Sequence, residues 1–146
     1  MLTHLVVQSD RVPPSGVVSI APGAIRGFDR LSELAMANAH TDNLSVPMSE
    51  THARWYVGDS GVALKDPLMS GAFIPFAPSW PRTLILVGTG DMLIDGTREL
   101  AKRLSALNLA VELVEYDGRP HGWWSMPQVF PEEFEDAVQR IARFIL

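Results

Sequence analysis

Apolar runs between turn residues predict three strands along the chain. β-rich segments at 17–21, 83–88 and 110–116 are each short and bounded by turn residues or helical patterns. The middle segment reads Thr83-Leu84-Ile85-Leu86-Val87-Gly88, and such a continuous apolar run is typical of a parallel strand covered on both faces. The pattern therefore predicts a buried parallel sheet.

Helical spacing of apolar residues follows the second strand. Leu100, Leu104 and Leu107 stand at i, i+4 and i+7, which places them on one face of a helix. Asp95 precedes this face at the expected position of an N-cap, and Asn108 is expected to end the helix. The predicted helix thus connects the second strand to the third.

A second amphipathic helix is predicted at the C-terminus. Pro131 occupies a typical first helical position, and two acidic residues follow in the first turn. The residues expected on its buried face are Phe134, Val138, Ile141 and Ile145. Strands that alternate with helices of this length indicate a βαβ crossover, so the fold class is α/β, with parallel strands and flanking helices.

The remaining segments carry weaker patterns. Residues 24–80 are expected to form a loop and helical excursion, with a helix at about 49–57. Residues 2–6 have helical spacing but no capping residue before them, so the chain is expected to begin inside a helix. The length of 146 residues favours a single domain over 1–146.

Composition excludes several classes of function. Because 12 basic residues face 17 acidic ones, a nucleic-acid partner is not expected. The absence of cysteine excludes disulfides, thiol catalysis and cysteine-ligated metals, and neither a His-x-x-x-His pair nor a dinucleotide fingerprint occurs, so no metal or cofactor is expected. No apolar run approaches the roughly 18 residues of a membrane span, and no signal peptide is recognisable. A cytoplasmic protein is the expectation.

Two polar residues follow neighbouring strands and are the candidates for chemistry. Asp91 lies three residues past the second strand and His121 five past the third. Because functional groups in α/β sheets collect beyond the carboxyl ends of the strands, the two side chains are expected to meet. An imidazole can transfer protons near neutral pH, and a carboxylate on its other nitrogen orients it. Asp91 alone could also be an ordinary turn former or helix cap.

The segments around this pair form an ordered pattern. They are Pro81 to Gly88, the Asp-x-Leu-x-Asp of residues 91–95, the helix Arg98 to Leu107, the strand Val111 to Tyr116, and Gly118-Arg119-Pro120-His121-Gly122. Together they resemble the C-terminal half of the hormone-sensitive-lipase-like α/β-hydrolases, a bacterial carboxylesterase family. The resemblance implies a partial α/β-hydrolase fold, Asp91 as acid and His121 as base of a catalytic triad, Asp95 as helix cap, and a small-molecule ester substrate.

The same resemblance implies a serine nucleophile that this sequence lacks. The family carries that serine in a Gly-Asp-Ser-Ala-Gly-Gly elbow, and its oxyanion hole uses a His-Gly-Gly-Gly segment; both would precede residue 1. Gly58-Asp59-Ser60-Gly61 resembles the elbow, but Val62 replaces its last glycine and a helix is predicted before it. Ser60 is therefore interpreted as part of a connecting turn, with a nucleophile as the less favoured alternative.

Two functions remain open. The chain is either the acid/base portion of an ester hydrolase whose serine comes from elsewhere, or a noncatalytic truncated fragment. In both cases the first strand would present an unpaired apolar edge, so a homo-oligomer or a complementing chain is expected. Trp123 and Trp124 could line a substrate pocket, although aromatic residues near a strand end more often belong to the core. The other histidines are interpreted as surface or packing residues: His4, His40 and His52.

Overall fold

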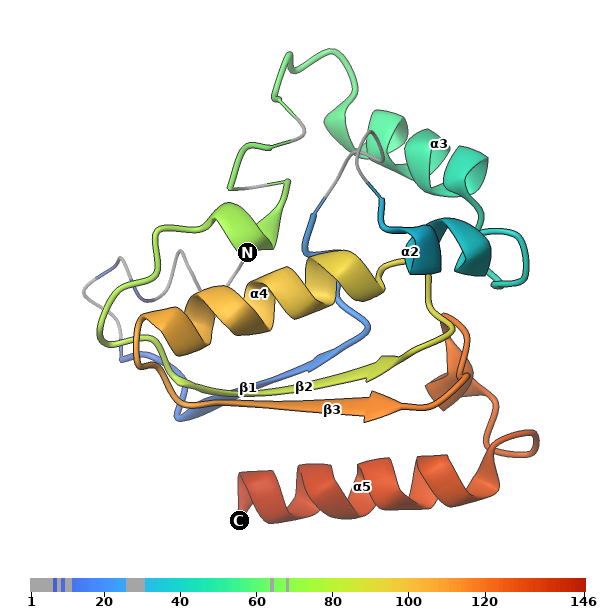
Figure 1. Ribbon diagram of the computed structural model, residues 1–146. Helices are drawn as coiled ribbons and strands as arrows, with labels where there is room; N and C mark the ends of the chain where they lie inside the picture. The colour runs from blue at the N-terminus through green and yellow to red at the C-terminus, as the bar shows by residue number, and fades with distance from the viewer. Residues whose placement is uncertain (1–6, 8, 10–11, 26–30, 64, 68) are drawn as a thin grey trace.

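Three parallel strands form the centre of the computed structural model (Figure 1). They are β1 (Gly16–Ile20), β2 (Arg82–Gly88) and β3 (Val111–Tyr116), in the order β1-β2-β3. The structure describes residues 7, 9, 12–25, 31–63, 65–67 and 69–146. All three predicted strands are confirmed to within one residue at each end, whereas the helix predicted at residues 2–6 lies outside the described residues.

The middle strand is covered on both faces by helices. β2 pairs with both neighbours, with Leu84 opposite Val18 of β1 and Glu112 of β3. Leu84 and Leu86 pack in the cluster shared with the C-terminal helix, while Ile85 packs in the cluster beneath the helix on the other face. Two-sided burial explains why this strand is apolar at successive positions.

The helix between β2 and β3 is α4 (Ile94–Ala106), and its start corrects the prediction for Asp95. Its N-cap residue is Leu93, which makes no side-chain cap bond. The Asp95 carboxylate instead accepts the N–H and hydroxyl of Ser32, at 2.7 and 2.8 Å. Asp95 is thus inside the first helical turn, where the positive end of the helix dipole stabilises a carboxylate.

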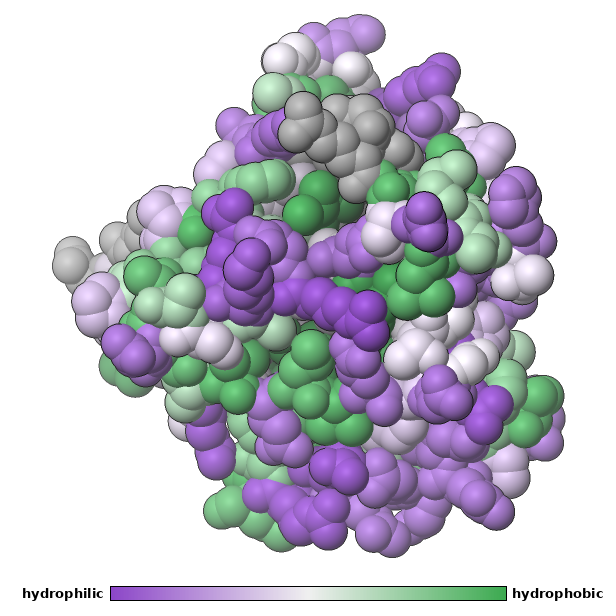
Figure 2. Space-filling model, in the orientation of Figure 1, coloured by the Kyte–Doolittle hydropathy of each residue, from purple (hydrophilic) through white to green (hydrophobic). Residues whose placement is uncertain are grey.

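At the C-terminal end of α4 the prediction is right for Asn108 and wrong for Leu107. Asn108 follows the helix with φ 56°, a left-handed conformation that asparagine tolerates at a helix end. Leu104 is buried, but Leu107 is 52% exposed because the helix ends at Ala106, so its predicted place on the buried face is wrong. The outward face of α4 forms a hydrophilic band across the middle of Figure 2.

The C-terminal helix α5 (Pro131–Ile145) begins at Pro131, as predicted, with Glu132 and Glu133 in its first turn. Its contact with the sheet runs through Ala137, Ile141 and Phe144. The predicted face was wrong at Val138 and Ile145, which are 44% and 68% exposed. Ala137 is small and lets the helix lie close to the sheet. Val138 and Ile145 each come one residue after a position that contacts the sheet, and the turn of the helix carries their side chains away from it.

Segment 24–80 contains α2 (Glu33–Asn38), α3 (Val46–Val57) and the short helix η1 (Gly71–Phe73), and no strand among its described residues. α3 begins three residues before the predicted start, because Ser45 caps it by accepting the N–H of Met48. α2 was not predicted. Within the described part of the chain, no helix is long and apolar enough to cross a bilayer.

An ion pair between α4 and β3 makes stability depend on pH. Arg98 donates two hydrogen bonds to the Glu115 carboxylate, at 2.7 and 2.8 Å, and these lower the pKa of Glu115. A carboxyl whose pKa is lower in the folded chain adds stability above its unfolded pKa and loses it as the pH falls through the folded pKa. We expect Glu115→Gln to reduce the free energy of unfolding at neutral pH by up to about 1 kcal/mol.

That loss should disappear in strongly acidic solution, where the wild-type carboxyl is also neutral. Urea unfolding of both chains at neutral and acidic pH measures it. Glu50→Gln serves as a control, because Glu50 makes only an exposed 3.6 Å pair with Arg54. A deficit of Glu115→Gln that is the same at both pH values would contradict the expectation.

Candidate active site

The two sequence-predicted site residues meet beyond the carboxyl ends of β2 and β3. His121 Nδ1 lies 2.9 Å from Asp91 Oδ2. The Asp91 side chain is fully buried, whereas that of His121 is 28% exposed. The acid is therefore shielded from water while the base is accessible at the surface. This geometry follows from parallel pairing, which brings the ends of adjacent strands to one edge of the sheet.

Local hydrogen bonds fix the orientation of the acid. Asp91 Oδ1 accepts the N–H of Leu93 at 2.8 Å, so both oxygens of the carboxylate have a donor. An ionised carboxylate only accepts hydrogen bonds, so the proton on the neutral His121 ring belongs on Nδ1. In that tautomer Nε2 is the acceptor nitrogen, as a general base requires. The ring of Trp124 packs edge to face against the imidazole, with 5.5 Å between the two ring centroids.

Two glycines let the acid and base loops lie against each other. A Cβ on Gly88 would stand 1.9 Å from the carbonyl oxygen of Arg119, and one on Gly90 would stand 2.9 Å from that of Gly118. The N–H of Gly90 also donates to the Arg119 carbonyl at 3.1 Å. Gly88-Thr89-Gly90 therefore makes room for the base loop at the end of β2.

We expect Gly88→Ala to destabilise the chain by about 1–3 kcal/mol or more, because its methyl group requires backbone to move. Gly71→Ala is the matched control, since its Cβ would meet only the end of the Ile74 side chain at 3.9 Å. Urea unfolding measures both variants. Equal stability of the two would show that the loops separate without cost and would contradict the expectation.

Thr89 joins the same two loops through its hydroxyl. Thr89 Oγ1 donates to Asp117 Oδ1 at 3.1 Å and accepts the N–H of Gly118 at 2.7 Å. The hydrogen-bonded contact between the loops therefore extends from the strand ends almost to His121.

The segment that includes α2 adds contacts that the sequence did not predict. Asn38 Nδ2 donates to the carbonyls of Thr89 and Asp91, at 2.8 and 3.1 Å. The Asp42 carboxylate accepts the N–H of Met92 and of His121, at 2.8 and 2.6 Å. These contacts span 50 to 79 residues of chain, and the only local signal was a polar cluster typical of a turn.

The other candidate residues from the sequence do not join the contact between Asp91 and His121. Trp123 is completely buried and packs against Tyr116 in the core, so the core interpretation is confirmed for this residue. Ser60 lies in an exposed turn after α3, and residues 61–63 are not helical, so the strand-turn-helix context of an elbow is absent there. His40 and His52 are exposed, and His4 lies outside the described residues.

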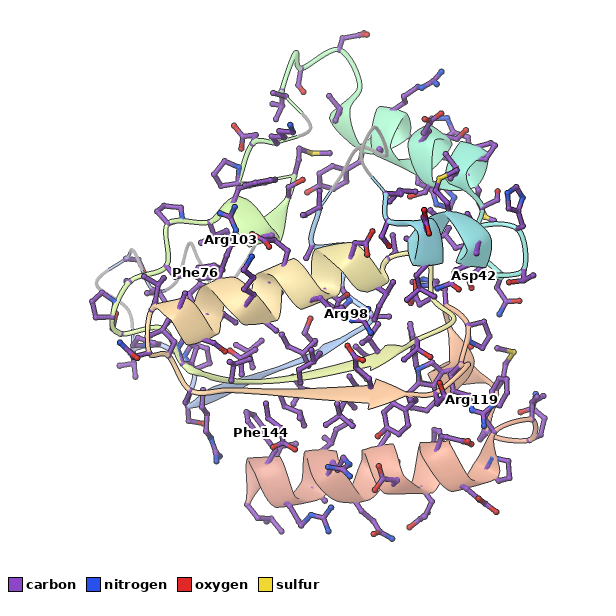
Figure 3. All side chains as sticks on the ribbon, in the orientation of Figure 1. Asp42, Phe76, Arg98, Arg103, Arg119 and Phe144 are labelled. Carbon is purple, nitrogen blue, oxygen red and sulfur yellow. The ribbon has the colours of Figure 1, made fainter. Side chains whose placement is uncertain are left out.

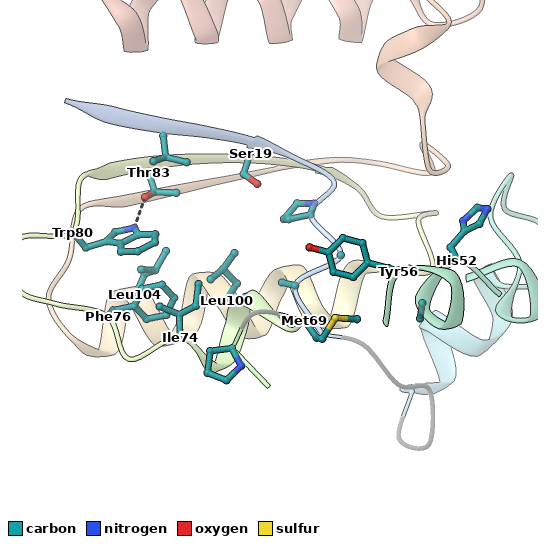
Figure 4. A pocket seen from close by; sticks show the side chains of 17 residues that line it. Ser19, His52, Tyr56, Met69, Ile74, Phe76, Trp80, Thr83, Leu100 and Leu104 are labelled. Carbon is teal, nitrogen blue, oxygen red and sulfur yellow. Dashed lines mark hydrogen bonds between the residues drawn. The ribbon is translucent and has the colours of Figure 1, made fainter. Parts of the chain in front are cut away.

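A cavity of about 470 Å³ lies between β1, α4, α3 and η1 (Figure 4). Its wall is mostly apolar, and Trp80 donates to Thr83 Oγ1 on one side at 3.1 Å. Neither Asp91 nor His121 lines it, so the cavity is separate from this pair. Over the ranges that the structure describes, no three metal-ligating side chains cluster.

Comparison with known proteins defines the class of this chain. Residues 1–125 match a family described as having an alpha/beta hydrolase fold. The chain therefore belongs to this α/β-hydrolase family, as the sequence pattern predicted. No curated protein sequence matches it.

Among solved structures, an esterase from the bacterial hormone-sensitive lipase family has a TM-score of 0.85 and is 24% identical, over 97% of this chain and 46% of that one. A hormone-sensitive lipase from a metagenome library has a TM-score of 0.82 at 24% identity, over 98% and 48%. An esterase/lipase from an uncultured bacterium has a TM-score of 0.80 at 21% identity, over 98% and 46%. The chain spans about half the length of these structures, and its fold is a partial α/β-hydrolase fold.

Proposed function

We propose that this chain is the acid/base portion of a carboxylic ester hydrolase, with Asp91 as the triad acid and His121 as the general acid/base. The observation that carries the proposal is the 2.9 Å contact between a buried carboxylate and an accessible imidazole. Its position at the carboxyl ends of adjacent parallel strands is where α/β folds hold their functional groups. Membership of the α/β-hydrolase family and the likeness to esterase structures support an ester as substrate.

In this proposal His121 Nε2 takes the proton of a serine hydroxyl as that oxygen attacks the ester carbonyl. The imidazolium then gives the proton to the leaving alkoxide, and the alcohol departs. A water molecule, deprotonated by the same nitrogen, attacks the acyl-serine and releases the acid, and the imidazolium returns the proton to the serine oxygen. Asp91 stays ionised throughout, holds the Nδ1–H tautomer and stabilises the imidazolium.

The serine in this scheme comes from outside the 146 residues. The sequence contains no Gly-x-Ser-x-Gly elbow, and Ser60 lies in a turn after a helix. The isolated chain should therefore lack triad-level turnover, because the pair has no hydroxyl to activate. Hydrolysis of p-nitrophenyl butyrate by the isolated chain, abolished by Ser60→Ala, would overturn this part of the proposal.

The coding sequence upstream of residue 1 gives the decisive test. We expect an in-frame Gly-x-Ser-x-Gly elbow, and we expect the extended chain to hydrolyse p-nitrophenyl butyrate. His121→Ala in that chain should abolish turnover, whereas His40→Ala, at an exposed histidine, should not. An extended chain that contains the elbow and folds, but hydrolyses no p-nitrophenyl ester, would contradict the proposal.

The absence of an elbow upstream would favour the second candidate, a noncatalytic α/β unit that acts through association. The observation behind this candidate is the position of β1 at the edge of the sheet, where it pairs only with β2 in the described part of the chain. Such an edge offers unpaired N–H and C=O groups to another strand. We expect an oligomer of the isolated chain in light scattering, and a monodisperse monomer would count against this candidate.

A further inference from the structure

We infer that Asp42 is a positioning residue, whose carboxylate sets the separation of the acid loop and the base loop. It lies between α2 and α3, at the end of the sheet to which β2 and β3 point (Figure 3). The inference rests on the proposed roles of Asp91 and His121, but its test does not depend on ester hydrolysis.

One carboxylate holds both loops. Asp42 Oδ2 accepts the N–H of Met92, the residue directly after Asp91, at 2.8 Å. Its Oδ1 accepts the N–H of His121 itself at 2.6 Å. Hydrogen bonds from N–H groups to an ionised oxygen are short and about twice as strong as neutral ones. The two oxygens of one rigid group therefore fix the acid loop relative to the base loop.

Two asparagines close to Asp42 in the chain bind the backbone carbonyls of His121 and Asp91. Asn43 Nδ2 donates to the carbonyl of His121 at 3.0 Å, so the base is held at both its N–H and its C=O. Asn38 Nδ2 donates to the carbonyl of Asp91 at 3.1 Å. Residues 38–43 therefore hold the peptide group that follows Asp91 at its C=O and its N–H, and they hold His121 at its own N–H and C=O.

A simple turn-forming role does not account for this arrangement. A turn-forming aspartate bonds nearby backbone, and Asp42 does so with the N–H of Asn43 at 2.7 Å. Its other two bonds reach residues 50 and 79 positions away. Asp91 and His121 belong to different strand ends, so their mutual geometry depends on contacts that span both loops. An acid and base pair is sensitive to such placement, since a misplacement of about 1 Å costs on the order of 100-fold in rate.

The test uses the chain with ¹⁵N-labelled histidine and measures the ring nitrogens of His121 by NMR above the pH at which the imidazole is protonated. We expect Asp42→Asn to lower the population of the Nδ1–H tautomer and to remove the low-field proton shared with Asp91. The asparagine has only one oxygen, so it can satisfy only one of the two loops. Asp42→Glu keeps the charge but moves the carboxylate by one methylene, and it should have the same effect.

Asp59→Asn is the matched control, because it removes the same charge from an exposed site beyond α3 and should leave the His121 signals unchanged. A folded Asp42→Asn chain with wild-type His121 ring signals would overturn the inference, whatever its stability. The wild-type chain gives a second measure, in case the variants fail to fold. Its Met92 and His121 amides should exchange with solvent roughly 10- to 100-fold more slowly than unbonded amides, and an unprotected amide at either residue would also overturn the inference.

Discussion

Asp91→Asn is expected to lower kcat by about four orders of magnitude in a chain that also contains the nucleophile, with little change in KM. Asparagine keeps the shape of the buried side chain, but its amide group can donate to His121 Nδ1. The ring would then carry its proton on Nε2, the nitrogen that must accept the serine proton. The effect therefore follows from the tautomer, and steady-state kinetics on a p-nitrophenyl ester measures it.

Asp95→Asn is the control for this prediction. Asp95 belongs to the same loop and helix start, but its carboxylate bonds Ser32 rather than His121. We expect it to affect stability and to leave kcat within a small factor. The tautomer can also be followed directly in the isolated chain, by the ¹⁵N signals of His121. An Asp91→Asn chain that keeps the Nδ1–H form would show that another contact orients the ring.

Trp123→Ala is expected to reduce the free energy of unfolding by about 3–5 kcal/mol, which is a large part of the stability of an ordinary domain. The side chain is fully buried, and its ring lies 4.4 Å from that of Tyr116 and 6.3 Å from that of Trp124. Trp123 packs in the same cluster as residues of α5 and lies two residues after His121 in the chain. Loss of its indole would leave a cavity at this place. Urea unfolding monitored by circular dichroism measures the loss.

Two variants separate packing from polarity at this position. Trp55→Ala removes an equally large side chain that is 76% exposed, and it should change stability by less than about 0.5 kcal/mol. Trp123→Phe keeps an aromatic ring and removes Nε1, which is buried without a hydrogen-bond partner in the described structure. Because an orphan donor is costly, we expect Trp123→Phe to lose much less stability than Trp123→Ala. Equal losses in these two variants would contradict the packing argument.

The class of fold and the acid/base pair could be predicted from short stretches of sequence. The strand run Thr83 to Gly88 and the segment Gly118 to Gly122 each contain their own signal, because strands, turns and helix starts depend on neighbouring residues. Parallel topology then adds the long-range step, since it brings the ends of adjacent strands together without further information. The contact between Asp91 and His121 therefore follows from local patterns and one rule of connectivity.

The support around that pair was decided by tertiary structure. Asn38 ends α2 and Asp42 lies in the polar turn after it, a stretch with no pattern of its own, and both reach the site because α2 packs beside the loop after β2. The same dependence explains the errors at Asp95, Leu107 and Val138. Periodicity shows that a helix has an apolar face, but the residue that lies against the sheet is selected by the size and position of its partners. Only the packed structure contains that information, because it depends on residues far apart in the chain.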